Sequence, residues 1–235
     1  MDKSSFNAEK PVCIVVMPFL SVLMPSLGVS MLKAMLARHG IGSDIFYGSL
    51  LMYNHFLTNS NAKDAFLDYN LIASNGNLGD IYFSSVFWQN NAPRGETVDD
   101  YLYKSVTIMP PGAVRDAAFF RIKCMQTHAS EFLECCFEAR DWSKYRIVGF
   151  SSSFAQQIAS LWLARRIKSA HPEINIVFGG ANCEAEMGQA ILQSFPFINH
   201  VIQGEADYVF PIYVQRILAG LTIIDLPGVL FREFD

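Results

Sequence analysis

Apolar runs alternate with amphipathic stretches at the start of the chain. Residues 12–17 form a Val- and Ile-rich run, apolar residues recur at helical spacing between Ser26 and Gly40, and a second short run covers 43–47. A continuous apolar run of this length is typical of a strand that is buried on both faces. Ser26 is a favourable N-cap, and glycine at position 40 commonly ends a helix. The pattern therefore predicts a strand, a helix and a second strand.

The second half of the chain repeats this alternation. Further strands are predicted at 147–151, 174–178 and 200–203, and an amphipathic helix follows each of them. Strands that alternate with helices form a parallel sheet covered on both faces, with right-handed crossovers. The sequence therefore predicts an α/β domain of the doubly wound, flavodoxin- or Rossmann-like kind, with five parallel strands.

A long segment, residues 48–145, separates the two halves. A crossover needs only about a dozen residues, so this segment is predicted to be a mainly helical insertion between 1–47 and 146–235. Its last part carries a helical stripe of apolar residues from Val114 to Cys136. Around 76–94 the chain is rich in Gly, Asn and aromatic residues, which predicts irregular structure.

Composition limits the partners that the chain can have. Hydrophobic residues make up 51% and charged residues 17%, and the formal net charge is -4. This balance predicts a folded protein with no affinity for nucleic acid or anionic membranes. The uncharged run 11–32 is long enough to cross a bilayer, but Pro18, Pro25 and Gly28 interrupt it, so a strand, a loop and a helix start are predicted. Five scattered cysteines do not form a disulfide scaffold, and a reducing cytoplasm is expected.

Small residues follow the strands where an open parallel sheet binds its ligands, beyond the carboxyl ends. Three serines follow one predicted strand, and Gly179 and Gly180 end the next. Serine hydroxyls can bind a ligand and glycines remove side-chain bulk, although a helix cap and a tight turn need the same residues. The candidate ligand-binding residues of these loops are Pro18, Phe19, Leu20, Ser26, Gly28, Ser151, Ser152, Ser153, Phe154, Gly179, Gly180, Ala181, Asn182, Gly204 and Glu205.

Several common chemistries lack their motifs. Neither a dinucleotide G-x-G-x-x-G nor a Walker sequence follows a predicted strand. Residues 149–153 resemble a nucleophile elbow, but Ser153 replaces its second glycine and no triad partners can be identified. The five histidines have no metal-binding spacing, and Cys135 and Cys136 are typical of core thiols in a helix. We therefore predict no metal ligands and no catalytic residues in this chain.

Four segments of the sequence indicate a particular protein family, which the hydrophobic periodicity alone does not. They read VGFSSSFAQQIASLWLARRIKSAHPEINIVFGGANCEAEMG (148–188), PSLGVSMLKAMLARHG (25–40), VIQGEADYVFPIYVQRI (201–217) and LPGVLFRE (226–233), and GDIYFSSVFWQ (79–89) is a further familiar string in the insertion. Together they resemble the N-terminal cobalamin-binding domain of cobalamin-dependent radical SAM proteins. The branch they look closest to matures ribosomally synthesised peptides (RiPPs).

The resemblance implies that the fold holds cobalamin with its nucleotide tail inserted beside the sheet. By position, Ser151 to Ser153 would contact the tail, Gly179 and Gly180 would make room for it, and the loop 18–28 would line the other side. Many cobalamin proteins carry Asp-x-His-x-x-Gly in that first loop, where the histidine ligates cobalt. This loop has no histidine, so cobalamin would bind without a ligand from it.

The resemblance also implies chemistry that this chain does not carry. Radical SAM enzymes hold an iron–sulfur cluster with Cys-x-x-x-Cys-x-x-Cys, and none of the five cysteines has this spacing. The cluster, S-adenosylmethionine and the catalytic domain are therefore expected in cis beyond LPGVLFRE, acting on a precursor peptide, with methylation the expected modification. The alternative is a non-enzymatic flavodoxin-like interaction module that has lost the cofactor.

The aromatic residues of the insertion leave two interpretations open. Tyr82, Phe83, Phe87 and Trp88 lie close together in the sequence. They could cover the corrin face or dock the catalytic domain, or they could belong to the insertion's own core.

Overall fold

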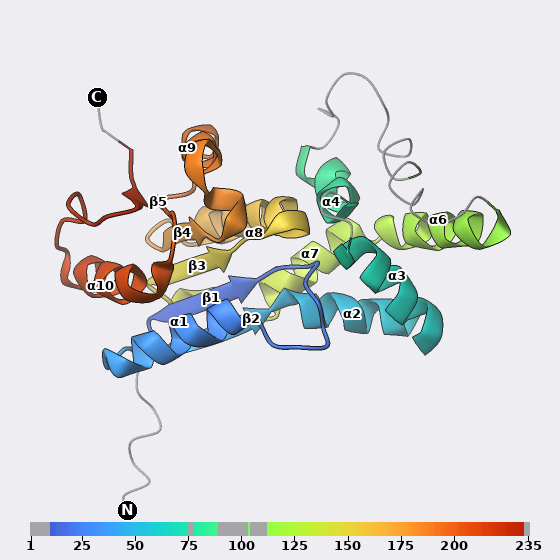
Figure 1. Cartoon of the computed structure of the whole chain (residues 1–235), viewed down its shortest axis with the longest axis horizontal. Helices are drawn as coiled ribbons and strands as arrows, with labels where there is room; N and C mark the ends of the chain where they lie inside the picture. The colour runs from blue at the N-terminus through green and yellow to red at the C-terminus, as the bar shows by residue number, and fades with distance from the viewer. Residues whose placement is uncertain (1–9, 75–77, 89–102, 104–111, 233–235) are drawn as a thin grey trace, which may run out of the picture.

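A twisted sheet forms the centre of the molecule. The computed structural model describes residues 10–74, 78–88, 103 and 112–232. The strand order is β2-β1-β3-β4-β5-β6, and the first five strands are parallel to one another (Figure 1). The strands are β1 (Val12–Val16), β2 (Ser43–Tyr47), β3 (Ile147–Ser151), β4 (Asn175–Gly179), β5 (His200–Ile202) and β6 (Val229–Leu230). The five-stranded, doubly wound part of the prediction is confirmed, and its order 2-1-3-4-5 is that of flavodoxin-like folds.

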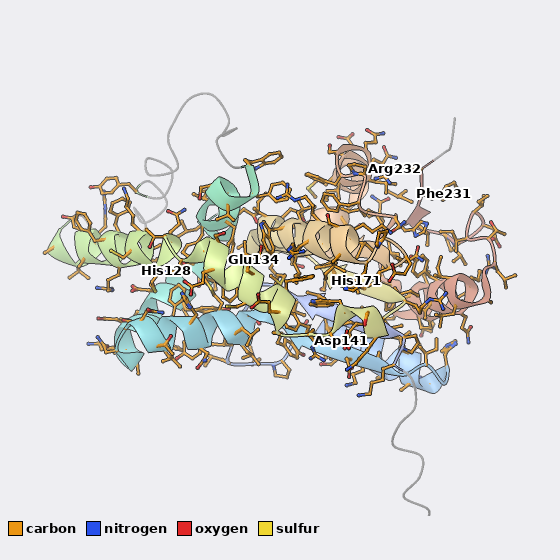
Figure 2. All side chains as sticks on the ribbon, turned by 180° about the vertical axis from the view of Figure 1, so that it is seen from behind. His128, Glu134, Asp141, His171, Phe231 and Arg232 are labelled. Carbon is orange, nitrogen blue, oxygen red and sulfur yellow. The ribbon has the colours of Figure 1, made fainter. Side chains whose placement is uncertain are left out.

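The sheet has one strand more than the sequence predicted. Strand β6 pairs antiparallel with β5 and comes from the stretch 226–233, which was expected to lead into a further domain. A two-residue strand shows no alternation, so its sequence carries no strand signal. Arg232 follows β6 and donates hydrogen bonds to the carbonyls of Ile198 (2.8 Å) and Phe195 (2.8 Å), which fastens this end of the chain beside α9 (Figure 2).

Helices cover the two faces of the sheet because successive side chains of a buried strand point in opposite directions. On one face, Ile14 and Val177 pack with α1 (Leu27–Arg38) and α10 (Ala206–Ala219). On the other, Phe150 and Phe178 pack with α8 (Gln157–Ala170) and α9 (Ala185–Ser194). Ser26 accepts a hydrogen bond from the Val29 N–H (3.4 Å), which confirms the predicted N-cap of α1. The uncharged run 11–32 is therefore a strand, a loop and a helix start, as predicted.

The insertion is helical, but its elements differ from two expectations. Its helices are α2 (Gly48–Asn59), α3 (Ala62–Ser74), α4 (Leu78–Trp88), α6 (Ala113–Gln126) and α7 (Ala129–Glu138), and the 3-10 turn η3 (Trp142–Lys144) leads into β3. The stripe predicted over 114–136 is divided between α6 and α7, because Thr127 donates to the Cys124 carbonyl (2.6 Å) and closes α6. The prediction of irregular structure is wrong for 78–88, and the rest of 76–94 lies outside the described residues.

The insertion packs against the sheet rather than apart from it. Its helices α2, α3, α4 and α6 lie on the side toward which β1 and β3 point (Figure 1), and α7 crosses the back, where Glu134 pairs with Arg166 of α8 at 3.3 Å (Figure 2). Tyr82, Phe83 and Phe87 are buried in the same cluster as the sheet face, whereas Trp88 is 40% exposed. The core interpretation is therefore confirmed for three of these four aromatic residues.

Candidate functional site

A cleft of about 170 Å³ opens at the carboxyl ends of β3, β4 and β5, on the face covered by α1 and α10. Among the predicted site residues, the structure brings six together in its lining: Gly28, Ser151, Gly179, Gly180, Gly204 and Glu205. The cleft therefore lies where ligands bind in open α/β sheets.

The floor of the cleft is made by residues on one face of three neighbouring strands. Gly149 pairs with Ile14 on one side and with Val177 on the other, and Ser151 pairs with Gly179 one step closer to the mouth. A Cβ on Gly149 would lie 3.4 Å from Phe210 Cζ and 3.5 Å from Val177 Cγ1. Because glycine leaves this volume empty, the two glycines deepen the cleft instead of filling it with core.

The cover and the mouth of the cleft differ in polarity. Leu32 of α1 and Phe210 of α10 close the deep end together with Ile14, Val177 and Ile202, and all of these side chains are apolar. Glu205 and Asp207, at the N-terminus of α10, lie at the mouth. The arrangement suits a ligand with an apolar, flat end that enters deeply and a polar part that stays outside.

The three serines after β3 have different environments. Ser151 lines the cleft, and its hydroxyl makes no hydrogen bond to another described residue. Ser152 is fully buried, and its hydroxyl donates to Gln157 Oε1 (2.7 Å) and accepts from Asn182 Nδ2 (3.0 Å). Ser153 forms a capping box with Gln156: its hydroxyl accepts from the Gln156 N–H, and its own N–H donates to Gln156 Oε1 (3.0 Å). The hydroxyl of Ser151 is thus the one available to a ligand, whereas Ser152 and Ser153 shape the loop.

The Gly179–Gly180 pair has one residue that shapes the cleft and one that the backbone requires. A Cβ on Gly179 would have a single close neighbour, the Ile202 carbonyl oxygen at 3.4 Å. Gly180 has φ +95°, and a Cβ there would lie 2.6 Å from the Ser152 carbonyl oxygen. The Asn182 N–H donates to that same carbonyl (3.1 Å). Gly180 is therefore needed for the close approach of two loops, in addition to any room that it leaves for a ligand.

The first loop is turned toward the insertion. Phe19 is buried, and its ring centroid lies 5.2 Å from Tyr69 and 5.4 Å from Tyr82. The Tyr69 hydroxyl donates to the Leu20 carbonyl (2.7 Å). The predicted site residues outside the cleft lining are Pro18, Phe19, Leu20, Ser26, Ser152, Ser153, Phe154, Ala181 and Asn182. Contact between any of these and a ligand stays a prediction.

Phe154 has an unusual backbone conformation in the turn that follows β3, outside the cleft lining. Its side chain is 71% exposed, and its backbone has φ +48°, a conformation that is strained for a bulky residue. Asn182 Nδ2 donates to the Phe154 carbonyl (2.9 Å) and holds this turn in place. The strained turn therefore presents a large apolar side chain to solvent.

Several lining residues were missed by the sequence reasoning. They are Ile14, Leu32, Gly149, Phe150, Val177, Phe178, Ile202 and Phe210. Gly149 had a usable signal, because it lies two residues before Ser151 on a strand and therefore on the same face. The helix residues had none, since only the packing of α1 and α10 decides which of their turns reach the sheet.

The described residues offer little other reactive chemistry. Burial raises the pKa of Cys13 and that of Cys183 to about 12, so both thiols stay protonated and unreactive near neutral pH. Cys136 is a buried core thiol as predicted, but the prediction is wrong for Cys135, which lies on the exposed side of α7. In the described part of the chain no three His, Cys, Asp or Glu side chains gather as a metal site would need, and no helix there could cross a bilayer.

A scan against protein-family models and a search of the curated proteins find no match to this chain. The resemblance carried by residues 148–188 therefore stays a prediction, and the proposal below depends on the geometry of the cleft.

Proposed function

We propose that this chain is a cobalamin-binding domain and that the cleft receives the nucleotide tail of the cofactor. The single observation that carries the proposal is the cleft lined by Gly149, Ser151 and Gly179, at the carboxyl edge of the sheet and beneath apolar side chains. The resemblance to cobalamin-binding domains implies that the nucleotide tail inserts at this place beside the sheet. The residues present fit such a group, because side chains larger than a methyl group at positions 149 and 179 would fill the cradle.

The size of the cleft supports a tail rather than a whole cofactor. Clefts that enclose drug-sized ligands measure roughly 300–1,000 Å³, whereas a cavity of about 150 Å³ lined by Leu, Ile and Phe is known to hold one benzene ring. At about 170 Å³, this cleft can accept a small aromatic ring system. The rest of the molecule would lie outside, over the loops that carry Phe154 and Glu205.

The residues of the chain would bind and orient, and they would carry out no bond-making themselves. Phe210 and Val177 would exclude water from the buried ring, and the free hydroxyl of Ser151 could donate one hydrogen bond to it. Bound cobalamin would supply a cobalt-carried methyl group. We further propose, from the resemblance alone, that an iron–sulfur cluster and S-adenosylmethionine in a radical SAM domain would use it to methylate a precursor peptide.

Retention of the coloured cofactor tests this proposal. The purified chain is mixed with hydroxocobalamin, free ligand is removed by gel filtration, and bound corrinoid is measured by absorbance. We expect retention of cobalamin and none of cobinamide, which lacks the nucleotide tail. Equal retention of both would show that the cleft does not hold the tail, and retention of neither would reject cofactor binding.

Position 149 offers a matched pair of variants. In Gly149→Ala the new methyl group would make ordinary contacts with Phe210 and Val177, so we expect affinity within about threefold of the wild type. In Gly149→Leu the longer side chain would fill the cleft, and we expect at least about tenfold weaker binding. Circular dichroism checks that both variants fold. Unchanged binding by Gly149→Leu would place the ligand elsewhere.

A second candidate function is an interaction module without a cofactor. The observation in its favour is Phe210, whose ring lies against Gly149 and already occupies part of the space over the sheet. If the wild type retains no corrinoid, this candidate takes precedence.

A further inference from the structure

The insertion reaches the loop after β3 through one polar side chain. Asp80, in the first turn of α4, accepts a hydrogen bond at Oδ1 from the Ile158 N–H (2.8 Å) and another from the Gln157 N–H. These are the first N–H groups of α8, which have no partner inside their own helix. A side chain 78 residues away in sequence from Ile158 therefore caps α8.

Helix α8 cannot supply this cap itself. Its N-cap residue, Gln156, makes no side-chain bond to the helix. The Gln156 amide donates instead to the Met17 carbonyl (2.6 Å) and accepts from the Ser153 N–H (3.0 Å), so it ties the ends of β1 and β3 together. Gln156 is 2% exposed and has no freedom to turn back. The cap must therefore come from another element, and Asp80 provides it.

The capped turn continues directly to the mouth of the cleft. Gln157, whose N–H binds Asp80, accepts a hydrogen bond from the Ser152 hydroxyl (2.7 Å) through its side chain. Asn182 then donates to the Ser152 hydroxyl (3.0 Å) and to the Phe154 carbonyl (2.9 Å). Ser152 lies next to Ser151 of the cleft floor. The chain of hydrogen bonds from α4 to the cleft thus passes through Gln157 and Ser152.

Close backbone packing keeps α4 in place for this contact. A Cβ on Gly79 would lie 2.5 Å from the Ala155 carbonyl oxygen and 2.9 Å from the Phe19 ring. The start of α4 therefore rests on both the turn after β3 and the first loop. The insertion supports the two loops from behind, and none of its described residues lines the cleft.

We propose that Asp80 is a positioning residue through which the insertion sets the loop 152–158 and, with it, the mouth of the cleft. The link to ligand binding rests on the proposed function, whereas the effect on the loop does not. Asp80 would touch no ligand. Its two hydrogen bonds fix the first turn of α8, and that turn fixes Ser152.

Amide hydrogen exchange on the full chain tests the effect on the loop. In Asp80→Ala we expect amides in 152–158 to exchange about tenfold faster, because the cap is lost, with little change in β4 and β5. Asp80→Asn keeps an oxygen acceptor, so exchange in this variant should be no faster than in the wild type. Asp116→Ala is the matched control, since Asp116 is an exposed first-turn acid of another insertion helix. The proposal would be overturned if amides over the whole chain exchanged equally faster in Asp80→Ala. It would also be overturned if amides in 152–158 exchanged at the same rate in Asp80→Ala as in Asp116→Ala.

Corrinoid retention tests the link to the cleft. We expect weaker retention by Asp80→Ala, restored in Asp80→Asn, and an effect that does not add to that of Gln157→Ala, because both changes break the same path. If the effects of Asp80→Ala and Gln157→Ala on retention were additive, Asp80 would not act on the cleft through Gln157. If the wild type retains no corrinoid, the proposed function fails, and hydrogen exchange alone still decides whether Asp80 positions the loop.

Discussion

The two faces of β3 and β4 are built from alternate residues of the same strands, yet toward the carboxyl ends of the strands one face is filled and the other is hollow. Toward the insertion, Phe150 and Phe178 are buried and stack with ring centroids 4.8 Å apart. Toward α1 and α10, the neighbouring positions are Gly149, Ser151 and Gly179, and a cleft remains. A sheet can therefore carry its stability on one face and a binding site on the other, provided that the period of two separates large from small residues.

The largest effect on stability is expected from a substitution on the filled face. Phe150→Ala removes a buried ring from the stack and leaves a cavity, so we expect the free energy of unfolding to fall by about 3–5 kcal/mol. Urea unfolding followed by circular dichroism measures this loss. A loss below about 1 kcal/mol would show that this face is not the main source of stability.

The next largest effect is expected at Gly180, where the backbone conformation matters as well as the space available for a side chain. Gly180→Ala places a side chain at φ +95° and against the Ser152 carbonyl, so we expect a loss of about 1–3 kcal/mol in urea unfolding. Gly28→Ala is the control, because a Cβ on this helical glycine of the cleft lining would meet nothing within 4 Å. It should be neutral or stabilising by up to about 1 kcal/mol. Equal losses in both variants would contradict the role given to Gly180.

The junction between the faces should respond to pH through Asp80. Burial raises the pKa of Asp80 from 3.8 to about 6, against the effect of its two hydrogen bonds from N–H groups. The folded chain then holds a proton that the unfolded chain releases, so this contribution to stability is complete below about pH 4 and is lost as the pH rises through 6. We expect Asp80→Asn to gain up to about 2 kcal/mol relative to the wild type between pH 4.5 and 7.5. The free energy of unfolding of both proteins is measured against pH by urea unfolding. If the two curves ran parallel between pH 4.5 and 7.5, the raised pKa of Asp80 would be contradicted.

The smallest effect should come from the cleft floor. Ser151→Ala removes a hydroxyl without a partner among the described residues, so urea unfolding should change by less than about 0.5 kcal/mol. If the hydroxyl donates to the cofactor, retention of cobalamin should weaken by about three- to tenfold. A marked loss of stability would show that Ser151 belongs to the structural set with Ser152.

Some features of the fold and the site could be predicted from the sequence, and others could not. Strands, the α1 cap at Ser26 and the small residues at the strand ends could be predicted, because each depends on local spacing. The loop 18–28 was predicted as a lining of the site, but Phe19 is held by Tyr69 and Tyr82 of the insertion. The irregular structure predicted around Tyr82 was wrong, since aromatic residues in a helix can be satisfied by tertiary packing that no local pattern shows.

The sequence by itself determined the doubly wound order of strands and helices, and it placed glycines and serines where a ligand can approach. Hydrophobic period and turn chemistry act over a few residues, so they can be recognised without coordinates. Only the tertiary structure decided that β6 joins the sheet, that Ser151 rather than Ser152 faces the cleft, and that Asp80 caps α8. Each of these depends on partners far apart in the chain, and their contacts are selected by packing of the whole fold.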